Sequence, residues 1–179
     1  IVVKPLDGEQ GQGVAVDLQT IEEVQGAIEA ARQFDSRVLL ESFHEGLDLR
    51  ILVIGFEVVA AAIRRPAQVI GDGKHSVGAL IEVQSRRRQA ATDGESKIPV
   101  DDETLRTLKA AGYDYDSILP SGEVLAVRRT ANLHTGGCLE DVTVILHPAR
   151  ADGAVRAARA LDMPVVGLDL MVPAADQPE

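Results

Sequence analysis

The first fourteen residues constrain this chain most, because an apolar segment leads directly into a turn that is rich in glycine. The segment Ile1–Pro5 is typical of a strand and carries Lys4, and Gly8, Gly11 and Gly13 follow it. Glycine adopts positive φ and lets the backbone approach a ligand closely. An ammonium group beside free backbone N–H groups is suited to phosphate. Two interpretations are open here: a phosphate-binding loop, or a strand and turn whose lysine is merely solvated.

The composition excludes several classes of protein. The 179 residues are 45% hydrophobic and 26% charged, as in a globular protein. No apolar stretch approaches the roughly 18 residues of a membrane span, so we expect no membrane partner. A net charge of −10, with three Phe, two Tyr and no Trp, argues against nucleic acid. The single Cys138 allows no disulfide within the chain and favours a cytoplasmic location. The start Ile-Val-Val has no initiator Met, and we expect a piece of a longer protein without a signal peptide.

Hydrophobic spacing and capping residues predict an α+β fold whose strands are mainly antiparallel, with flanking helices. Thr20 and Glu23 form a capping box, and Asp101 and Ser76 are placed to cap later helices. The break His44–Gly46 is a predicted hinge. Apolar alternation on both sides of Gly55-Phe56 predicts a hairpin. The predicted helices span about 20–34, 76–87 (packed through Val77, Leu80 and Ile81), 102–112 (packed through Leu105 and Leu108) and a segment from Pro148 (packed through Ala151, Val155, Ala158 and Leu161); the predicted strands span 38–43, 48–54, 57–63, 123–129 and 164–172, the last as a central strand.

Charged side chains on the predicted hairpin are candidates for anion binding. Arg50 and Arg65 lie on its successive strands, and cross-strand neighbours on one face can converge on one anion. A guanidinium group suits phosphate oxygens. Pairing of Arg50 with Asp48 or Glu57 at the surface is the alternative.

Two further loops carry polar groups. His75 follows a Gly-Asp-Gly turn and either contacts phosphate or serves as a capping or structural group. The long loop from Thr130 to Cys138 contains an amide, hydroxyls and paired glycines but no strong nucleophile. Such donors can stabilise a transferred group or orient a carboxylate, and they do not suit Ser/His/Asp catalysis. The run Arg86–Arg88 either ends a solvated helix or holds an anionic substrate.

Five motifs follow one another in an order that resembles ATP-grasp ligases. The cyanophycin synthetase-like branch is the most similar, and the segments 85–88, 130–137 and 164–170 also resemble the ATP-grasp domain of N-acetylglutaminylglutamine synthetase. The motifs are Lys4 with Asp7–Gly13, Glu41–Phe43 with Asp48–Arg50, Arg64–Ala67 with Gly71–Ser76, Asn132–Gly137, and Gly167–Asp169.

The resemblance implies two lobes and an ADP-forming activity. Residues 1–43 would be the remainder of the small nucleotide-binding lobe, and residues 44–179 the large lobe. Such ligases use ATP with Mg²⁺ to phosphorylate a carboxylate, and an amine then attacks the acylphosphate to form an amide. The implied substrates are small molecules, amino acids or N-acylated amino acids, and a homo-oligomer is a further implication.

The resemblance also assigns roles to residues. Arg65 and Asn132 would be catalytic, Asp169 would bind the metal, and Glu45 is an alternative to Asp48 for the ribose. The implied ATP-binding residues are Lys4, Gly8, Gly11, Gly13, Glu41, Ser42, Phe43 and Asp48; those for substrate or phosphate are Arg50, His75, Thr135, Gly136 and Gly137.

The metal site departs from the family pattern. These ligases usually add a Glu-x-Asn pair on the strand after the acidic one, and this chain ends at Glu179 before such a motif. We therefore expect the large lobe to be truncated and this piece to be impaired in catalysis. The alternative function is a non-catalytic nucleotide-binding or sensing module, and a weaker one is a structural domain whose glycine loops are only turns.

Overall fold

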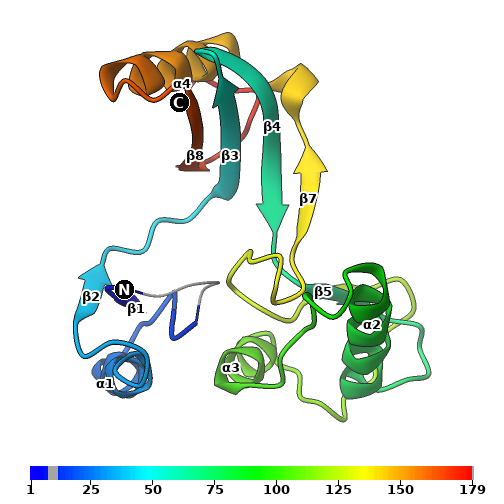
Figure 1. Ribbon diagram of the computed structural model, residues 1–179. Helices are drawn as coiled ribbons and strands as arrows, with labels where there is room; N and C mark the ends of the chain where they lie inside the picture. The colour runs from blue at the N-terminus through cyan, green and yellow to red at the C-terminus, as the bar shows by residue number, and fades with distance from the viewer. Residues whose placement is uncertain (8–11, 179) are drawn as a thin grey trace. The chain divides into compact units, whose positions relative to one another are not determined.

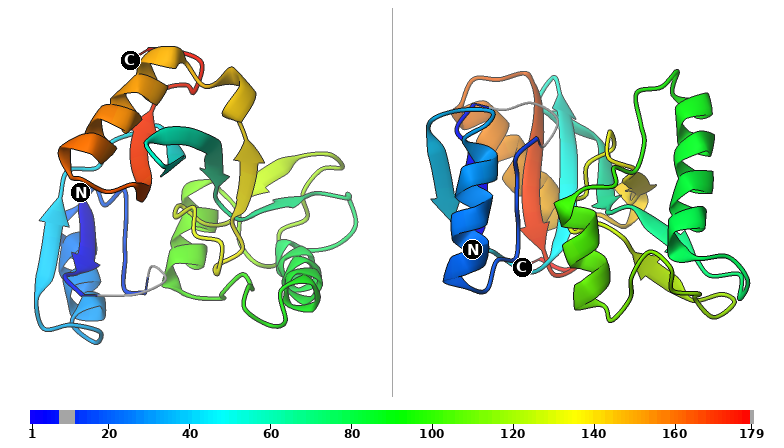
Figure 2. Two further views of the ribbon diagram at one scale, coloured as in Figure 1. Left: turned by 45° about the horizontal axis from the view of Figure 1, so that its top comes forward. Right: turned by 90° about the horizontal axis from the view of Figure 1, so that it is seen from below.

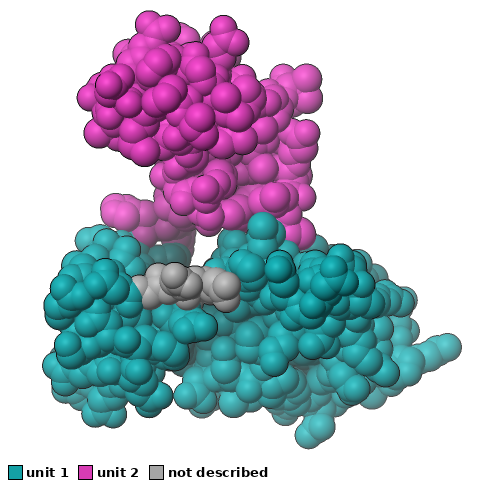
Figure 3. Space-filling model, viewed as in Figure 1, with its two compact units in different colours: residues 1–43, 66–137 teal, residues 44–65, 138–179 magenta. Residues whose placement is uncertain are grey.

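A computed structural model of the chain describes residues 1–7 and 12–178, so Gly8 and Gly11 lie outside the described residues. The chain forms two compact units, which Figure 3 shows in different colours. Unit 1 comprises residues 1–43 and 66–137, and unit 2 comprises residues 44–65 and 138–179. The assignment of residues 1–43 and 44–179 to two lobes of an ATP-grasp ligase stays a prediction. Within the described part, no helix is long and apolar enough to cross a membrane.

Unit 2 is built on an antiparallel sheet with the strand order β7-β4-β3-β8 among the described residues (Figure 1). The predicted hairpin is confirmed, since β3 and β4 pair on either side of the turn at Gly55-Phe56. The predicted central strand, in contrast, lies at the end of this described sheet as β8. The elements are β3 (Leu47–Ile54), β4 (Glu57–Arg65), β7 (Cys138–Asp141), the 3-10 helix η1 (Thr143–Ile145), α4 (Pro148–Ala160) and β8 (Val165–Val172).

One face of this sheet is apolar because its strands alternate. Leu49, Ile51 and Val53 are fully buried on β3, and they share a core cluster with Ala154 and Ala158 of α4. Two views show α4 lying along the sheet (Figure 2). Since truncating a buried leucine costs about 2–5 kcal/mol, this face holds the unit together and leaves the opposite face free for polar side chains.

Among its described residues, unit 1 has two small sheets, each with its own apolar cluster. In the first, β1 pairs with β2 and α1 packs beside them around Val3, Ala27 and Ala31. In the second, β5 pairs with β6, and the cluster includes Ile81 and Leu108. The elements are β1 (Val2–Pro5), α1 (Ile21–Ala31), β2 (Val38–Glu41), β5 (Gln68–Ile70), α2 (Val77–Ala91), α3 (Asp102–Ala110) and β6 (Val124–Ala126).

The helix starts follow the sequence prediction, whereas some packing predictions are wrong. The capping box of Thr20 and Glu23 is present, and Asp101 accepts a hydrogen bond from Thr104 N at the start of α3. Leu105, predicted to pack with Leu108, is 48% exposed. Leu161, predicted to pack from the last helix, lies beyond α4 and is 66% exposed. Helical spacing marks a face but not how wide its contact is.

The α+β prediction is confirmed. Every strand pair of the described residues is antiparallel, and helices flank the sheets of both units.

Candidate functional site

Two of the predicted nucleotide-binding residues form an ion pair in unit 1. Lys4 Nζ lies 2.7 Å from a carboxylate oxygen of Glu41, and both side chains are partly exposed, at 36% and 44%. The register of β1 and β2 brings them together, because Val2 pairs with Glu41 and Lys4 pairs with Leu39. An exposed pair of this kind contributes about 0–1 kcal/mol, so the ammonium group can exchange its partner for an anion.

Three more residues that were predicted to bind the nucleotide, Ser42, Phe43 and Gly13, lie near Lys4 or Glu41 in sequence. Ser42 is exposed and Phe43 is half-buried just after β2. Gly13 has φ of +68°, and a Cβ there would come within 2.6 Å of the Phe34 ring. Gly13 and Thr135 line one cavity of about 710 Å³ in unit 1. The structure therefore brings together one residue predicted for nucleotide and one predicted for phosphate.

Unit 2 presents a charged face on the side of its sheet away from α4. In the antiparallel register, Asp48 pairs with Arg64 and Arg50 pairs with Asp169. The prediction that Arg65 shares a face with Arg50 is wrong. Arg50 lies opposite Ala62, so strand alternation puts Arg64 on its face and turns Arg65 to the other side.

These four side chains are joined by ion pairs. Arg64 Nη2 lies 2.8 Å from Asp48 Oδ1 and 3.1 Å from Asp169 Oδ1, and Arg50 Nη1 lies 3.3 Å from the same Asp169 oxygen. Burial by itself would lower the pKa of Arg64, but hydrogen bonding and charge from Asp48 and Asp169 outweigh it and raise that pKa. The buried Nε of Arg64 has no partner among the described residues.

The ion pairs of the charged face bear on two predictions. Asp48, predicted to accept from a ribose, is committed to Arg64. Arg50 pairs with neither Asp48 nor Glu57, because Asp169 is its cross-strand neighbour. Gly167 makes room for Arg50, since a Cβ at that position would lie 2.6 Å from Arg50 Nη2.

Arg65, the predicted catalytic arginine, pairs instead with Glu140 of β7, at 2.8 Å between Nη2 and Oε2. The two side chains are 40% and 53% exposed, so this contact contributes little to stability. Arg65 retains an accessible guanidinium group, separate from the face of Arg50 and Arg64.

Asp169 is a candidate metal ligand whose carboxylate is paired with Arg50 and Arg64. The described residues contain no group of three His, Cys, Asp or Glu side chains that could hold a metal ion. Mg²⁺ commonly takes one or two carboxylates together with phosphate oxygens and water. The described residues thus fit a magnesium ion only as one carboxylate beside a bound triphosphate.

The loop Thr130–Gly137 is closed by its own hydrogen bonds. The carbonyl oxygen of Asn132 accepts from Thr135 N at 3.2 Å and from Gly137 N at 2.8 Å, and Leu133 O accepts from Gly136 N at 3.2 Å. The N–H groups of Gly136 and Gly137 are therefore already bonded within the loop. Asn132 Oδ1 accepts from His134 N at 2.8 Å, so its NH₂ group is the end that remains for a ligand.

His75 has structural contacts within its turn, whereas Ser76 is the residue that caps α2. Its Nδ1 lies 2.5 Å from Asp72 Oδ2, and its backbone N–H donates to Asp72 Oδ1 at 2.8 Å. These backbone and side-chain bonds from His75, with a further one from Lys74 N, hold the pKa of Asp72 well below its usual range. In the run Arg86–Arg88, Arg88 donates to Gly137 O at 2.9 Å. His75 and Arg88 thus both bond to other residues of the chain.

Comparison with known proteins finds similarity over almost the whole chain. No protein-family model matches it. The chain is 38% identical to the cyanophycin synthetase of a Nostoc species over 182 residues, which is 99% of this chain and 20% of that protein. It is 34% identical to the glutathione biosynthesis bifunctional protein GshAB of Listeria monocytogenes over 97% of this chain and 23% of that protein.

A solved structure is similar as well. The bifunctional glutathione synthetase of Pasteurella multocida has a TM-score of 0.63 and 30% identity over 99% of this chain and 24% of that one. The chain thus spans about a fifth to a quarter of the length of these relatives. These similarities support the resemblance to ATP-grasp ligases that the motifs indicate.

Two residues near the candidate site were missed from the sequence. Arg64 directly precedes Arg65. Selecting Arg64 would have required the register of the hairpin, in which Arg50 lies opposite Ala62 and therefore on the same face as Arg64. Glu103 is a buried carboxylate, yet in sequence it is one of several acids at the start of a helix, which is an ordinary pattern. No local signal distinguishes it.

Proposed function

We propose that this chain is part of an ATP-dependent, ADP-forming carboxylate–amine ligase that makes a peptide-like bond through an acylphosphate. The observation that carries this proposal is the 38% identity to cyanophycin synthetase across 99% of the chain. The proposed substrates are amino acids or N-acylated amino acids; this proposal extends the resemblance to N-acetylglutaminylglutamine synthetase that three segments of the sequence suggest.

The residues of unit 1 offer cationic and neutral donors. Lys4 would bind phosphate oxygens of ATP by exchanging Glu41, and Glu41–Phe43 would bind the adenine base. The NH₂ group of Asn132 would orient the reacting groups, together with the hydroxyl of Thr135, which donates to Asn132 O at 3.2 Å and is left as an acceptor. Charge neutralisation and positioning are the main tasks of a protein in phosphoryl transfer.

The charged face of unit 2 supports the proposal on its own. The 47% exposed guanidinium group of Arg50 offers donors to an acidic ligand such as a substrate carboxylate or a phosphate. Asp169 would give a magnesium ion one carboxylate ligand, and the metal would supply charge neutralisation when bound. The arginines would release Asp169 as they take up the anion.

The test is ATP turnover by the protein that contains this chain. Purified protein is incubated with Mg²⁺ and ATP, an acidic or N-acylated amino acid and a panel of amines, and ADP is measured. ADP formation that requires both a carboxylate and an amine is the expected result. Absence of turnover across the panel contradicts the ligase, and nucleotide binding without turnover would favour the sensing module.

Two variants make this test specific. Lys4→Ala should abolish ADP formation, because it removes the proposed contact with the phosphates of ATP. The variant should still fold, since the exposed pair with Glu41 adds little to stability. Cys138→Ala should retain it, because that thiol is not among the proposed ligand contacts. Equal loss in the two variants would attribute the effect to misfolding.

A further inference from the structure

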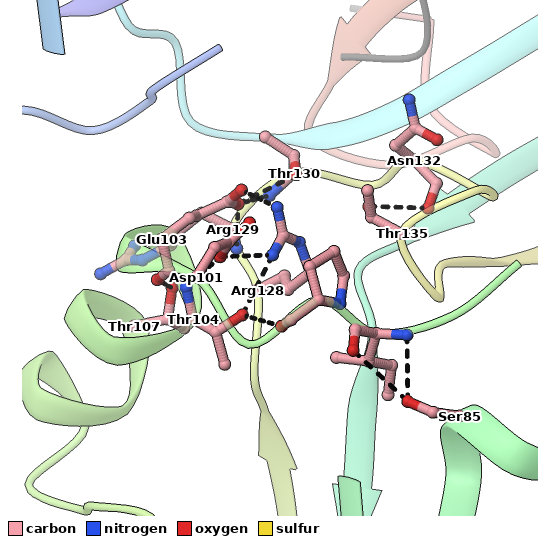
Figure 4. A network of polar contacts seen from close by, with 12 residues as sticks. Ser85, Asp101, Glu103, Thr104, Thr107, Arg128, Arg129, Thr130, Asn132 and Thr135 are labelled. Carbon is pink, nitrogen blue, oxygen red and sulfur yellow. Dashed lines mark hydrogen bonds and ion pairs between the residues drawn. The ribbon is translucent and has the colours of Figure 1, made fainter. Parts of the chain in front are cut away.

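The loop Thr130–Gly137 is tied at its start to a nearly buried carboxylate. Glu103 lies in the first turn of α3, and its side chain is 10% exposed. Its Oε1 accepts from Arg129 N at 3.1 Å, Thr130 N at 2.9 Å and Thr130 Oγ1 at 2.9 Å (Figure 4). Three donors at the loop entry therefore converge on one oxygen atom.

The second oxygen of Glu103 pairs with Arg128, whose side chain is 5% exposed. Arg128 Nη1 also donates to Asp101 Oδ1 at 2.8 Å and to Thr104 Oγ1 at 3.0 Å. Buried charges are costly unless they are paired and hydrogen-bonded. Here the two charges face each other, so the first turn of α3 and the loop entry form one polar unit.

The rest of the loop is held from other elements. Ser96 Oγ donates to Leu133 O at 2.6 Å, and Lys97 N donates to His134 O at 3.1 Å. Arg88 closes the far end through its bond to Gly137 O. Asn132 thus lies between two fixed points, although it makes none of these external bonds itself.

We infer that Glu103 and Arg128 are positioning residues, which fix the entry of the loop and thereby hold the amide of Asn132 for the reaction. The inference rests on the proposed ligase function. A buried ion pair is weak evidence for stability, and its best-attested use is to specify one conformation. That use suits a loop whose donors must be held in place, because a small displacement of a positioned group slows catalysis strongly.

The test uses variants of the complete protein that remove single contacts. Thr130→Val removes one donor with little change of shape, and Thr130→Ser keeps it. Glu103→Gln keeps an acceptor for the loop but presents an NH₂ group to Arg128. Asp102→Asn is the control, since it is an exposed acid on the same turn of α3.

Hydrogen exchange and kinetics are read together. In Thr130→Val and Glu103→Gln we expect amides 130–137 to exchange about tenfold faster, the size of one lost hydrogen bond to a charged group. We expect kcat to fall about tenfold or more, with KM for ATP within about twofold, because orientation and not binding is lost. Thr130→Ser and Asp102→Asn should behave as wild type.

The outcomes separate this inference from the proposed function. Unchanged exchange in both Thr130→Val and Glu103→Gln overturns the anchoring, and faster exchange with unchanged kcat overturns the positioning role. A wild-type protein that forms no ADP overturns the ligase and with it the catalytic purpose of the anchor. The exchange measurement decides the anchor itself in every case, since it needs no turnover.

Discussion

Each unit of the chain contains a network of arginines and carboxylates, and the two networks differ in burial. In unit 1, the side chains of Arg128 and Glu103 are 5% and 10% exposed. In unit 2, those of Arg50 and Asp169 are 47% and 50% exposed. The pair of Glu103 with Arg128 therefore lies in a nearly dry environment, and the pair of Arg50 with Asp169 in a wet one, with Arg64 and Asp48 of unit 2 between them at 23% and 25% exposure.

Burial changes what such a network can do. A buried pair is strongly destabilised when one member is removed, because the other charge remains without water or a partner. An exposed pair contributes at most about 1 kcal/mol and can exchange its partner for a ligand. The network of unit 1 is therefore suited to holding a conformation, and the network of unit 2 is suited to binding.

The largest effect is expected from breaking the buried network. Glu103→Ala should lower the free energy of unfolding of the chain by up to about 3–5 kcal/mol, because it leaves the buried charge of Arg128 with the partly exposed Asp101 as its charged partner. Urea unfolding followed by circular dichroism measures the change. Asp102→Ala on the same helix should stay within about 0.5 kcal/mol of wild type. A loss below about 1 kcal/mol for Glu103→Ala would show that water reaches the pair.

Two glycines extend the comparison to the backbone. Gly136 in unit 1 has φ of +94°, and a Cβ there would lie 2.5 Å from Ile98. Gly136→Ala should cost about 1–3 kcal/mol through strain. In unit 2, a Cβ at Gly167 meets only the mobile guanidinium group of Arg50, so Gly167→Ala should cost less than about 1 kcal/mol.

Of these two glycine variants, the one with the smaller loss of stability should still show a loss of activity. Gly167→Ala should reduce ADP formation by more than its small loss of stability explains, because the added Cβ displaces the guanidinium group of Arg50. Unfolding curves and ADP assays on the same preparations give both quantities. A Gly167→Ala variant with normal activity would argue against a binding role for the charged face.

A smaller stability effect is expected on the charged face itself. Arg50→Ala should change the free energy of unfolding by about 1 kcal/mol or less, because its pair with Asp169 is screened by solvent. It should nevertheless lower ADP formation by the complete protein about a hundredfold, the size typical of a lost transition-state contact. If Arg50→Ala lost as much stability as Glu103→Ala, the charged face would be a structural network like that of unit 1.

The smallest effect concerns Asp101 at low pH. Burial by itself would raise the pKa of Asp101, but hydrogen bonds from Thr104 and Arg128 outweigh it and lower that pKa. A carboxylate with a lowered folded-state pKa stabilises the fold above its ordinary pKa near 4, and this contribution is lost as the pH falls further.

Asp101→Asn isolates that charge, since Asn also caps helices well. At pH 6 the variant should be less stable than wild type by up to about 1 kcal/mol, limited by the partial exposure of Asp101. The difference should shrink as the pH is lowered from about 4 towards 2. Urea midpoints at several pH values measure it, and a pH-independent difference would exclude the charge as its cause.

Local patterns in the sequence predicted much of the fold. Alternation around Gly55-Phe56 predicted the hairpin, and Thr20 with Glu23 predicted the start of α1. Strand β5 is only three residues long, too short for a periodic signal, and it was not predicted. Exposure of Leu105 and Leu161 was not foreseen either, because helical spacing does not say how many turns a neighbouring element covers.

The candidate site was predicted in part. The pair of Lys4 with Glu41 joins two residues that the motifs had selected. Arg65 was preferred to Arg64 because the hairpin register was not considered, and a shift by one residue moves a side chain to the other face. The loop around Asn132 was selected for its donors, but the backbone donors of Thr135, Gly136 and Gly137 are bonded within the loop.

The sequence by itself determined the class of fold, the order of most elements and the motifs that resemble ATP-grasp ligases, because periodicity and caps are local properties. Tertiary structure decided which charges are buried and which face the solvent. No local pattern in the sequence distinguishes Arg128 from Arg50. Only the packing of α3 against the entry of the loop around Asn132 buries Arg128 and makes it an anchor. Pairing between residues far apart in the chain fixes that difference, and no local pattern encodes it.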